Sequence, residues 1–147
     1  MISQSAEETR KLGECLAGEL QPGDVILLEG PLGAGKSELS RGVAKGLGVQ
    51  ETVTSPSFTI LNVYESGRIP LYHFDWYRLE SPDELYEMGM EEYLGGNGAA
   101  LVEWPWRAPE VLPADFLMIE ILPTGENERA FRTYRHGNFR NKSHWIF

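Results

Sequence analysis

The chain has 147 residues, which is enough for one domain with a single hydrophobic core and too few for two domains of ordinary size. A hydrophobic fraction of 41% and a charged fraction of 24% are typical of a folded globular protein. The formal net charge of -9 means that the surface as a whole repels polyphosphates, which disfavours a free-standing nucleic-acid binder. The single cysteine, Cys15, excludes an internal disulfide, and no apolar run is long enough to span a bilayer. Residues 1–20 lack the pattern of a signal peptide, so we expect a protein of the reducing cytoplasm.

The N-terminal part of the chain predicts a helix, a strand, a loop and a second helix. A capping box begins at Ser5 and leucines recur every four residues after it, which predicts an amphipathic helix over about residues 5–20 with Cys15 in the core. Residues 25–28 form a continuous apolar run of the kind found in strands that are buried on both faces. Helical spacing resumes after a glycine-rich loop and ends near Gly48.

The remainder of the chain predicts further strands and one short helix. We expect a hairpin formed by residues 58–64 and 69–76, a helix capped by Ser81, a strand over residues 99–103, and a pair of strands at 116–122 and 129–134. Strands that alternate with helices define the α/β class. We therefore expect one domain over residues 1–147, with a basic C-terminal tail over about residues 136–147.

Residues 30–37, with the sequence GPLGAGKS, match the phosphate-binding pattern G-x-x-x-x-G-K-[ST] and lie between a predicted strand and a predicted helix. Glycine is needed where the loop wraps closely around a phosphate, because a Cβ would collide with the ligand or the backbone. In this pattern Lys36 reaches the β- and γ-phosphates, and the Ser37 hydroxyl binds Mg²⁺. A plain glycine-rich turn with a solvated Lys36 is the alternative, but the flanking strand and helix favour a P-loop. The expected nucleotide contacts are Gly30, Pro31, Leu32, Gly33, Ala34, Gly35, Lys36, Ser37 and Glu38.

Two acidic residues stand at the ends of predicted strands. Asp75 ends an aromatic run in which strand alternation places His73 and Asp75 on one face and the aromatic residues on the other. Glu103 ends a short apolar strand. In P-loop folds such acids hold the metal and position water. A metal role and the role of an ordinary strand-end carboxylate are both open from position alone. For His73 a structural role is favoured over that of a base.

Polar and aromatic residues near these acids have more than one interpretation. Trp104 and Trp106 are suited to stacking on a base, to filling a partner surface or to packing in the core. A group of hydroxyls fits either a switch segment that meets Mg²⁺ and the γ-phosphate or a turn without a ligand. These hydroxyls belong to Thr54, Ser55, Ser57 and Thr59.

Four ordered blocks of the chain resemble the YjeE/TsaE family, the small ATPases of bacterial tRNA threonylcarbamoyladenosine (t6A) biosynthesis. The P-loop alone is unspecific, whereas its combination with the HFDxYRL and VEWP blocks is highly specific. The matching blocks are GPLGAGKSELSRG (30–42), TSPSFTILNVYE (54–65), LYHFDWYRLESPDELYEMGMEEYL (71–94) and LVEWPWRAPEVLP (101–113).

The resemblance implies a three-layer, P-loop NTPase-like α/β fold with a central mixed β-sheet flanked by helices. It also implies weak, Mg²⁺-dependent ATP hydrolysis in support of the TsaB and TsaD proteins, which modify adenosine 37 of tRNAs that read codons beginning with A. The tRNA would be an indirect partner, and no membrane is implied. Carried over by position, Lys36 and Ser37 bind phosphate and Mg²⁺, Thr59 lies in the switch-like segment, Asp75 and Glu103 serve the metal and the attacking water, and Trp104 lies beside the nucleotide.

The chain departs from the family pattern at two P-loop positions. Pro31 stands where an acidic residue is common, which removes one backbone N–H, and Ser37 stands where threonine is common but keeps the hydroxyl. Neither change excludes ATP. Beyond the blocks, residues 126–147 carry five basic and two acidic residues, which suits a solvated tail or a contact with RNA or an acidic partner.

Three other functions compete with an accessory ATPase. A small-molecule P-loop kinase would need an acceptor pocket and an arginine-bearing lid, for which the sequence has no arginine-rich insertion. A GTPase would need an N-K-x-D motif, and the similar string at residues 141–144 lacks the acid. A nucleotide-dependent binding module, in which hydrolysis hardly matters, is separated from an ATPase only by testing binding and turnover independently.

Overall fold

A computed structural model describes residues 1–139, and Arg140 and Lys142 of the expected basic tail lie outside the described residues. The central sheet has seven strands in the order β1-β7-β6-β2-β5-β4-β3. Strands β6, β2, β5 and β4 are parallel neighbours, while β3 and β7 pair antiparallel with β4 and β6, so the sheet is mixed. The strands are β1 Ile2–Ser3, β2 Val25–Glu29, β3 Leu61–Tyr64, β4 Leu71–Asp75, β5 Ala99–Glu103, β6 Phe116–Pro123 and β7 Arg129–His136.

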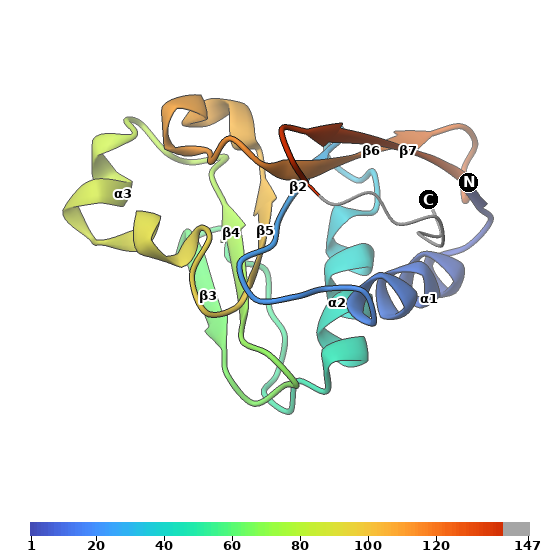
Figure 1. The fold of residues 1–147 in the computed structure, drawn as a ribbon. Helices are drawn as coiled ribbons and strands as arrows, with labels where there is room; N and C mark the ends of the chain where they lie inside the picture. The colour runs from blue at the N-terminus through green and yellow to red at the C-terminus, as the bar shows by residue number, and fades with distance from the viewer. Residues whose placement is uncertain (140–147) are drawn as a thin grey trace.

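Helices cover both faces of the sheet (Figure 1). Helix α1, Ala6–Ala17, and helix α2, Lys36–Leu47, pack together on one face. Helix α3, Asp83–Glu87, lies on the other face with three 3₁₀ turns, η1 Met90–Tyr93, η2 Pro105–Arg107 and η3 Pro109–Val111. The α/β prediction of a mixed sheet flanked by helices is confirmed. No helix within residues 1–139 has both the length and the apolar character needed to cross a membrane.

Helices α1 and α2 approach each other through glycines. A Cβ on Gly42 would lie 2.0 Å from the Arg10 carbonyl oxygen, and one on Gly13 would lie 2.3 Å from the Leu39 carbonyl oxygen, so neither position has room for a side chain. This close crossing decides which face of α1 is buried. The expectation that Cys15 belongs to the core is wrong, because its side of α1 is exposed while Gly13 faces α2.

The strand cores were predicted better than the element ends. The first strand of the predicted hairpin is shorter than expected, because residues 57–59 form a turn that leads into β3 and Phe58 is 83% exposed. Helix α3 begins one residue later than expected, although the Ser81 hydroxyl does accept a hydrogen bond from the Asp83 backbone N–H at 3.2 Å. Strand β1 and η1 were not predicted, since two and four residues are too short to show a hydrophobic period.

The parallel strands bring their carboxyl ends to one edge of the sheet. Strand β2 is buried on both faces from Val25 to Leu28, as its apolar run predicts. The side chains of Tyr72 and Phe74 in β4, and of Trp76 directly after it, join the core beneath α3, as the predicted alternation requires. Glu103 at the end of β5 lies opposite Asp75 of β4 on one side and Leu28 of β2 on the other. The loop that follows β2 therefore emerges beside both strand-end acids.

Candidate nucleotide-binding site

Residues 30–35 turn between β2 and α2, and two of them adopt a conformation that side chains disfavour. Gly33 and Gly35 have φ angles of 78° and 110°, in the left-handed region that glycine adopts without strain. Gly30 lies so close to β6 that a Cβ there would be 2.6 Å from the Ile121 carbonyl oxygen. The loop ends at Lys36, where α2 starts with its first N–H groups unpaired by the helix itself. This is the backbone arrangement of a site for phosphate.

Lys36 is the cation of this site, and its side chain is buried. Its Nζ donates a hydrogen bond to the Gly30 carbonyl oxygen at 2.7 Å and lies 3.9 Å from the centre of the Trp104 ring. Burial lowers the pKa of Lys36 below its usual value, while the carboxylates of Glu103, Asp75 and Glu29 act in the opposite direction. The ammonium group thus lies at the edge of the sheet that also carries Asp75 and Glu103.

Asp75 and Glu103 are buried carboxylates on neighbouring strands, with exposed fractions of 7% and 5%. Asp75 Oδ1 accepts a hydrogen bond from the Tyr77 backbone N–H at 2.9 Å. Burial raises the pKa of Asp75, and the nearby Glu103 charge raises it further, against the effects of the Tyr77 N–H, His73 and Lys36. Two adjacent carboxylates that face a buried lysine form a site suited to a bound cation and to charged phosphate oxygens.

A cavity of about 290 Å³ joins these groups. It brings together most of the residues that the sequence assigned to the nucleotide and the metal. It also includes two hydroxyls, those of Ser55 and Ser57, whose oxygens are 2.7 Å apart. The lining residues are Leu32, Gly33, Gly35, Lys36, Ser37, Glu38, Ser55, Ser57, Asp75, Glu103 and Trp104.

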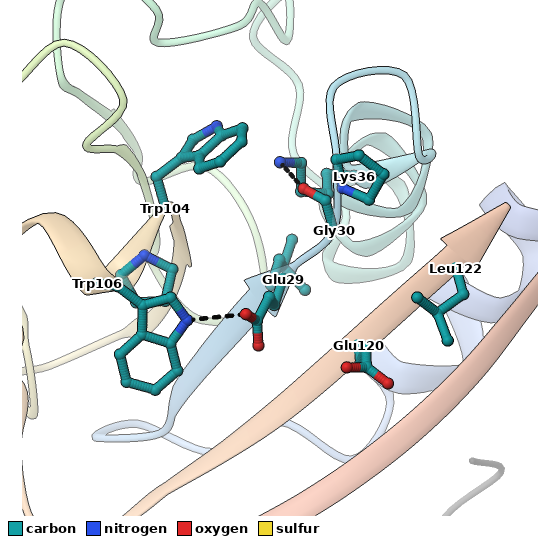
Figure 2. Close-up of a pocket in the computed structure, with 10 residues that line it drawn as sticks. Glu29, Gly30, Lys36, Trp104, Trp106, Glu120 and Leu122 are labelled. Carbon is teal, nitrogen blue, oxygen red and sulfur yellow. Dashed lines mark hydrogen bonds between the residues drawn. The ribbon is translucent and has the colours of Figure 1, made fainter.

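A second cavity, of about 270 Å³, shares Lys36 and Trp104 with the first and is shown in Figure 2. Gly30 and Pro31 line this cavity instead of the first one. Trp106, which is half exposed, donates a hydrogen bond from Nε1 to Glu29 Oε1 at 3.0 Å. The two tryptophans thus have different surroundings: Trp104 packs against Lys36 between the two cavities, and Trp106 packs over the end of β2.

Two assigned residues lie away from both cavities. The Thr59 hydroxyl is exposed and donates to Asn62 Oδ1 at 2.9 Å, so the neighbouring serines of the same segment, and not Thr59, face the P-loop. Ala34 is fully buried, and its carbonyl oxygen accepts a hydrogen bond from Arg129.

Arg129 is a site residue that the sequence did not reveal. Its Nε donates to the Ala34 carbonyl oxygen at 2.9 Å and its Nη2 to the Gly33 carbonyl oxygen at 3.2 Å, so β7 supports the P-loop from behind. An arginine near a strand start carries no local signal of this contact. The sequence analysis favoured a structural role for His73, but its contact with Glu103 becomes visible only once β4 and β5 are known to be neighbours.

The fold and this loop define a P-loop protein of the α/β class. Comparison with known proteins identifies the family within this class. The family model described as "Threonylcarbamoyl adenosine biosynthesis protein TsaE" matches residues 3–131. The chain belongs to the TsaE family.

Relatives and a solved structure agree with this membership. A "tRNA threonylcarbamoyladenosine biosynthesis protein TsaE" of Bacillus subtilis is 45% identical over 132 residues, which cover 90% of this chain and 82% of the relative. The protein of the same name from Treponema pallidum is 39% identical over 128 residues, covering 87% and 94% of the two chains. The crystal structure of Bacillus subtilis YdiB superimposes with a TM-score of 0.79 at 40% identity, covering 94% of this chain and 85% of that one.

Proposed function

We propose that this protein is a Mg²⁺-dependent ATPase that serves t6A biosynthesis together with TsaB and TsaD. The observation that carries the proposal is the first cavity, in which the P-loop lysine faces two strand-end carboxylates. The t6A role follows from the names of the TsaE relatives. Because tRNA is modified in the cytoplasm, we place the protein there as well. Family membership does not favour the alternative of a small-molecule kinase.

The residues that line the first cavity fit a nucleoside triphosphate and a magnesium ion. Among residues 1–139 no group of three or more His, Cys, Asp or Glu side chains could hold a metal. Mg²⁺ does not need such a group, because it usually keeps several waters and binds through one or two carboxylates and phosphate oxygens. The Ser37 hydroxyl and the Asp75 and Glu103 carboxylates line the same cavity, and we assign them to this purpose. When bound, the ion would neutralise charge on the phosphates.

The chain's own groups account for the remaining requirements of hydrolysis. Lys36 leaves the neutral oxygen of Gly30 for charged phosphate oxygens, with which it makes stronger hydrogen bonds. The N–H groups of the P-loop and of the start of α2 would bind the phosphates. Glu103 and Asp75 accept hydrogen bonds from water and hold it in line with the terminal phosphate. Trp104 shields Lys36 from solvent, which strengthens these electrostatic interactions.

The test is an ATP hydrolysis assay with the purified protein, alone and with TsaB and TsaD, in which release of phosphate is measured with and without Mg²⁺. We expect slow turnover that requires Mg²⁺ and increases when both partners are present. GTP and a panel of small phosphate acceptors serve as controls. Phosphate transfer to a small acceptor, or turnover that is indifferent to the partners, would contradict the proposal and favour a kinase.

A further inference from the structure

His73 is a buried polar side chain that lines neither of the two cavities described above. It lies on β4, two residues before Asp75, and only 3% of it is exposed. Its Nε2 is 2.6 Å from Glu103 Oε2, which makes this a short hydrogen bond between neighbouring strands. Its other ring nitrogen, Nδ1, is also buried and has no hydrogen-bond partner among residues 1–139. The imidazole therefore has one polar partner, and that partner is Glu103.

A histidine with an unpaired buried nitrogen lowers the stability of the folded protein at this position. Leaving a buried acceptor without a donor costs about 1–3 kcal/mol, and an apolar side chain in a buried strand has no such cost. The neighbours of His73 in β4, Tyr72 and Phe74, belong to the apolar core. What an apolar residue cannot supply here is a hydrogen-bond donor to Glu103.

The direction of the contact follows from the chemistry of the two groups. A carboxylate oxygen accepts, so the ring donates from Nε2–H. The bond fixes Oε2 of Glu103 and restricts the rotation of the carboxylate about its side chain, while Oε1 is not used by His73. Glu103 lines the first cavity together with Lys36 and Asp75, so the position of its second oxygen determines where water can be held.

We propose that His73 is a positioning residue, which fixes the Glu103 carboxylate so that its second oxygen faces the terminal phosphate and the attacking water. This inference rests on the proposed ATPase function, in which Glu103 holds that water. His73 does not touch the substrate in this role. Its contribution is to place Glu103 before the substrate arrives, and a carboxylate that is free to rotate would hold the water correctly for only part of the time.

Two amide substitutions separate this role from a purely structural one. In His73→Gln the side-chain amide reaches about as far as Nε2 and can donate to Glu103, whereas in His73→Asn it reaches only about as far as Nδ1. Both side chains are neutral and polar, so they perturb the core in similar ways. The third variant, His73→Leu, removes the donor and the unpaired nitrogen together. Tyr72→Phe, on the opposite face of β4, controls for general disturbance of the strand.

The experiment measures ATP affinity, kcat for ATP hydrolysis and melting temperature for the parent and the four variants. We expect kcat to fall about 10- to 100-fold in His73→Leu and His73→Asn, the usual effect of losing a group that orients a catalytic ligand, with ATP affinity retained. We expect His73→Gln to recover most of the loss and Tyr72→Phe to match the parent. Should His73→Leu fail to fold, the comparison of His73→Gln with His73→Asn still shows whether the hydrogen-bond donor is needed for hydrolysis.

Two outcomes would contradict the positioning role of His73, and a third would contradict the proposed ATPase function on which it rests. If kcat is unchanged in His73→Asn and His73→Leu, or if the Gln and Asn variants lose the same amount, His73 does not position Glu103. If the parent itself hydrolyses no ATP, with or without TsaB and TsaD, the ATPase function fails instead. The parent measurement therefore distinguishes the two failures.

Discussion

Lys36 is the residue whose removal should affect binding most. Its hydrogen bond is to a backbone carbonyl, which is uncharged, whereas the phosphates of a nucleotide carry full charges and make stronger hydrogen bonds. We expect Lys36→Ala to weaken ATP binding about 30-fold or more, the usual consequence of removing one side of a desolvated charge pair. Titration calorimetry measures the change. Lys45→Ala is the control, since this exposed lysine lies in the last turn of the same helix. Equal affinities in parent and Lys36→Ala would contradict the site.

The two strand-end acids should affect turnover more than binding. Asp75 and Glu103 line the cavity with Lys36, and their proposed work is to hold the metal and the water in the transition state. We expect Asp75→Ala and Glu103→Ala to keep substantial ATP binding and to lose hydrolysis by about 100- to 1000-fold. Binding and phosphate release are measured separately, with the exposed Glu87→Ala in α3 as the control. Turnover equal to that of the parent would remove these residues from the mechanism.

Asp75 should also make the folded protein less stable at neutral pH. Its pKa is raised by burial, so the folded protein holds this proton more tightly than the unfolded chain does. Stability therefore falls as pH rises from the usual aspartate value of 3.8 through the raised value, and the penalty is complete above it. Asp75→Asn keeps the acceptor for the Tyr77 N–H and removes the charge. We expect it to raise the melting temperature of the metal-free protein at neutral pH, with a gain that shrinks in acid.

Thermal melts of parent and Asp75→Asn across a pH series test this expectation. A gain that is the same at every pH would mean that the charge is not responsible. A loss of stability at neutral pH would mean that the carboxylate is stabilised by its neighbours more than it is penalised by burial. The expected result has a functional implication, because the buried charge that lowers stability is the one that the site needs for its metal.

The crossing of α1 and α2 is the element contact most sensitive to side-chain size. α2 carries Lys36 and Ser37 at its start, so its position relative to the sheet sets the position of the site. A Cβ on Gly42 would come within 2.0 Å of the Arg10 carbonyl oxygen, and only a shift of the helices relieves this overlap. We expect Gly42→Ala to destabilise the protein by about 1–3 kcal/mol, as overpacking of a close contact does.

Chemical denaturation measures this loss, and Gly18→Ala is its control. Gly18 caps α1 with a φ angle of -63°, which alanine also adopts, and the nearest atom to a Cβ there is 3.4 Å away. We expect the control to leave the unfolding free energy unchanged or slightly higher, because alanine restricts the unfolded chain. If Gly42→Ala is as stable as the control, the close crossing does not exist in solution.

The parts of the site that depend on one segment could be predicted from the sequence. The P-loop is one strand, one loop and one helix, and all three leave local signals around Gly30 and Lys36. The meeting of Asp75 and Glu103 was also predictable, because parallel strands share an edge at their carboxyl ends. These features need only the general rules of α/β folds.

Other parts depend on which strands are neighbours and on how the chain turns after them. Trp104 reaches Lys36 because its φ angle is 55°, a conformation that is unusual for a tryptophan and has no signature in the sequence. The His73 contact with Glu103 requires the order β4 next to β5. The burial of α1 depends on a glycine contact with α2, and this is why the periodicity of the leucines placed Cys15 wrongly.

Arg129 connects two distant parts of the chain, because it reaches from β7 to the Ala34 carbonyl, which lies 95 residues earlier in the sequence. It holds the carbonyl oxygens of Gly33 and Ala34, so that the N–H groups of the same loop are kept in place on the opposite side. A loop that is fixed before binding loses less entropy when the phosphate arrives. We therefore expect Arg129 to affect the affinity of the site for ATP and not the rate of hydrolysis.

We expect Arg129→Met to lower ATP affinity about tenfold, since two hydrogen bonds of about 0.5–1.5 kcal/mol each no longer restrain the loop. Methionine keeps the apolar stem of the side chain and loses the donors. Calorimetric titration gives the affinity, and Arg132→Met, an exposed position on the same strand, controls for the loss of positive charge. Because Arg129 does not line the cavity with Asp75 and Glu103, kcat at saturating ATP should stay near that of the parent. A fall in kcat with unchanged affinity would instead place Arg129 in the chemical step, and the P-loop would then need no support from β7.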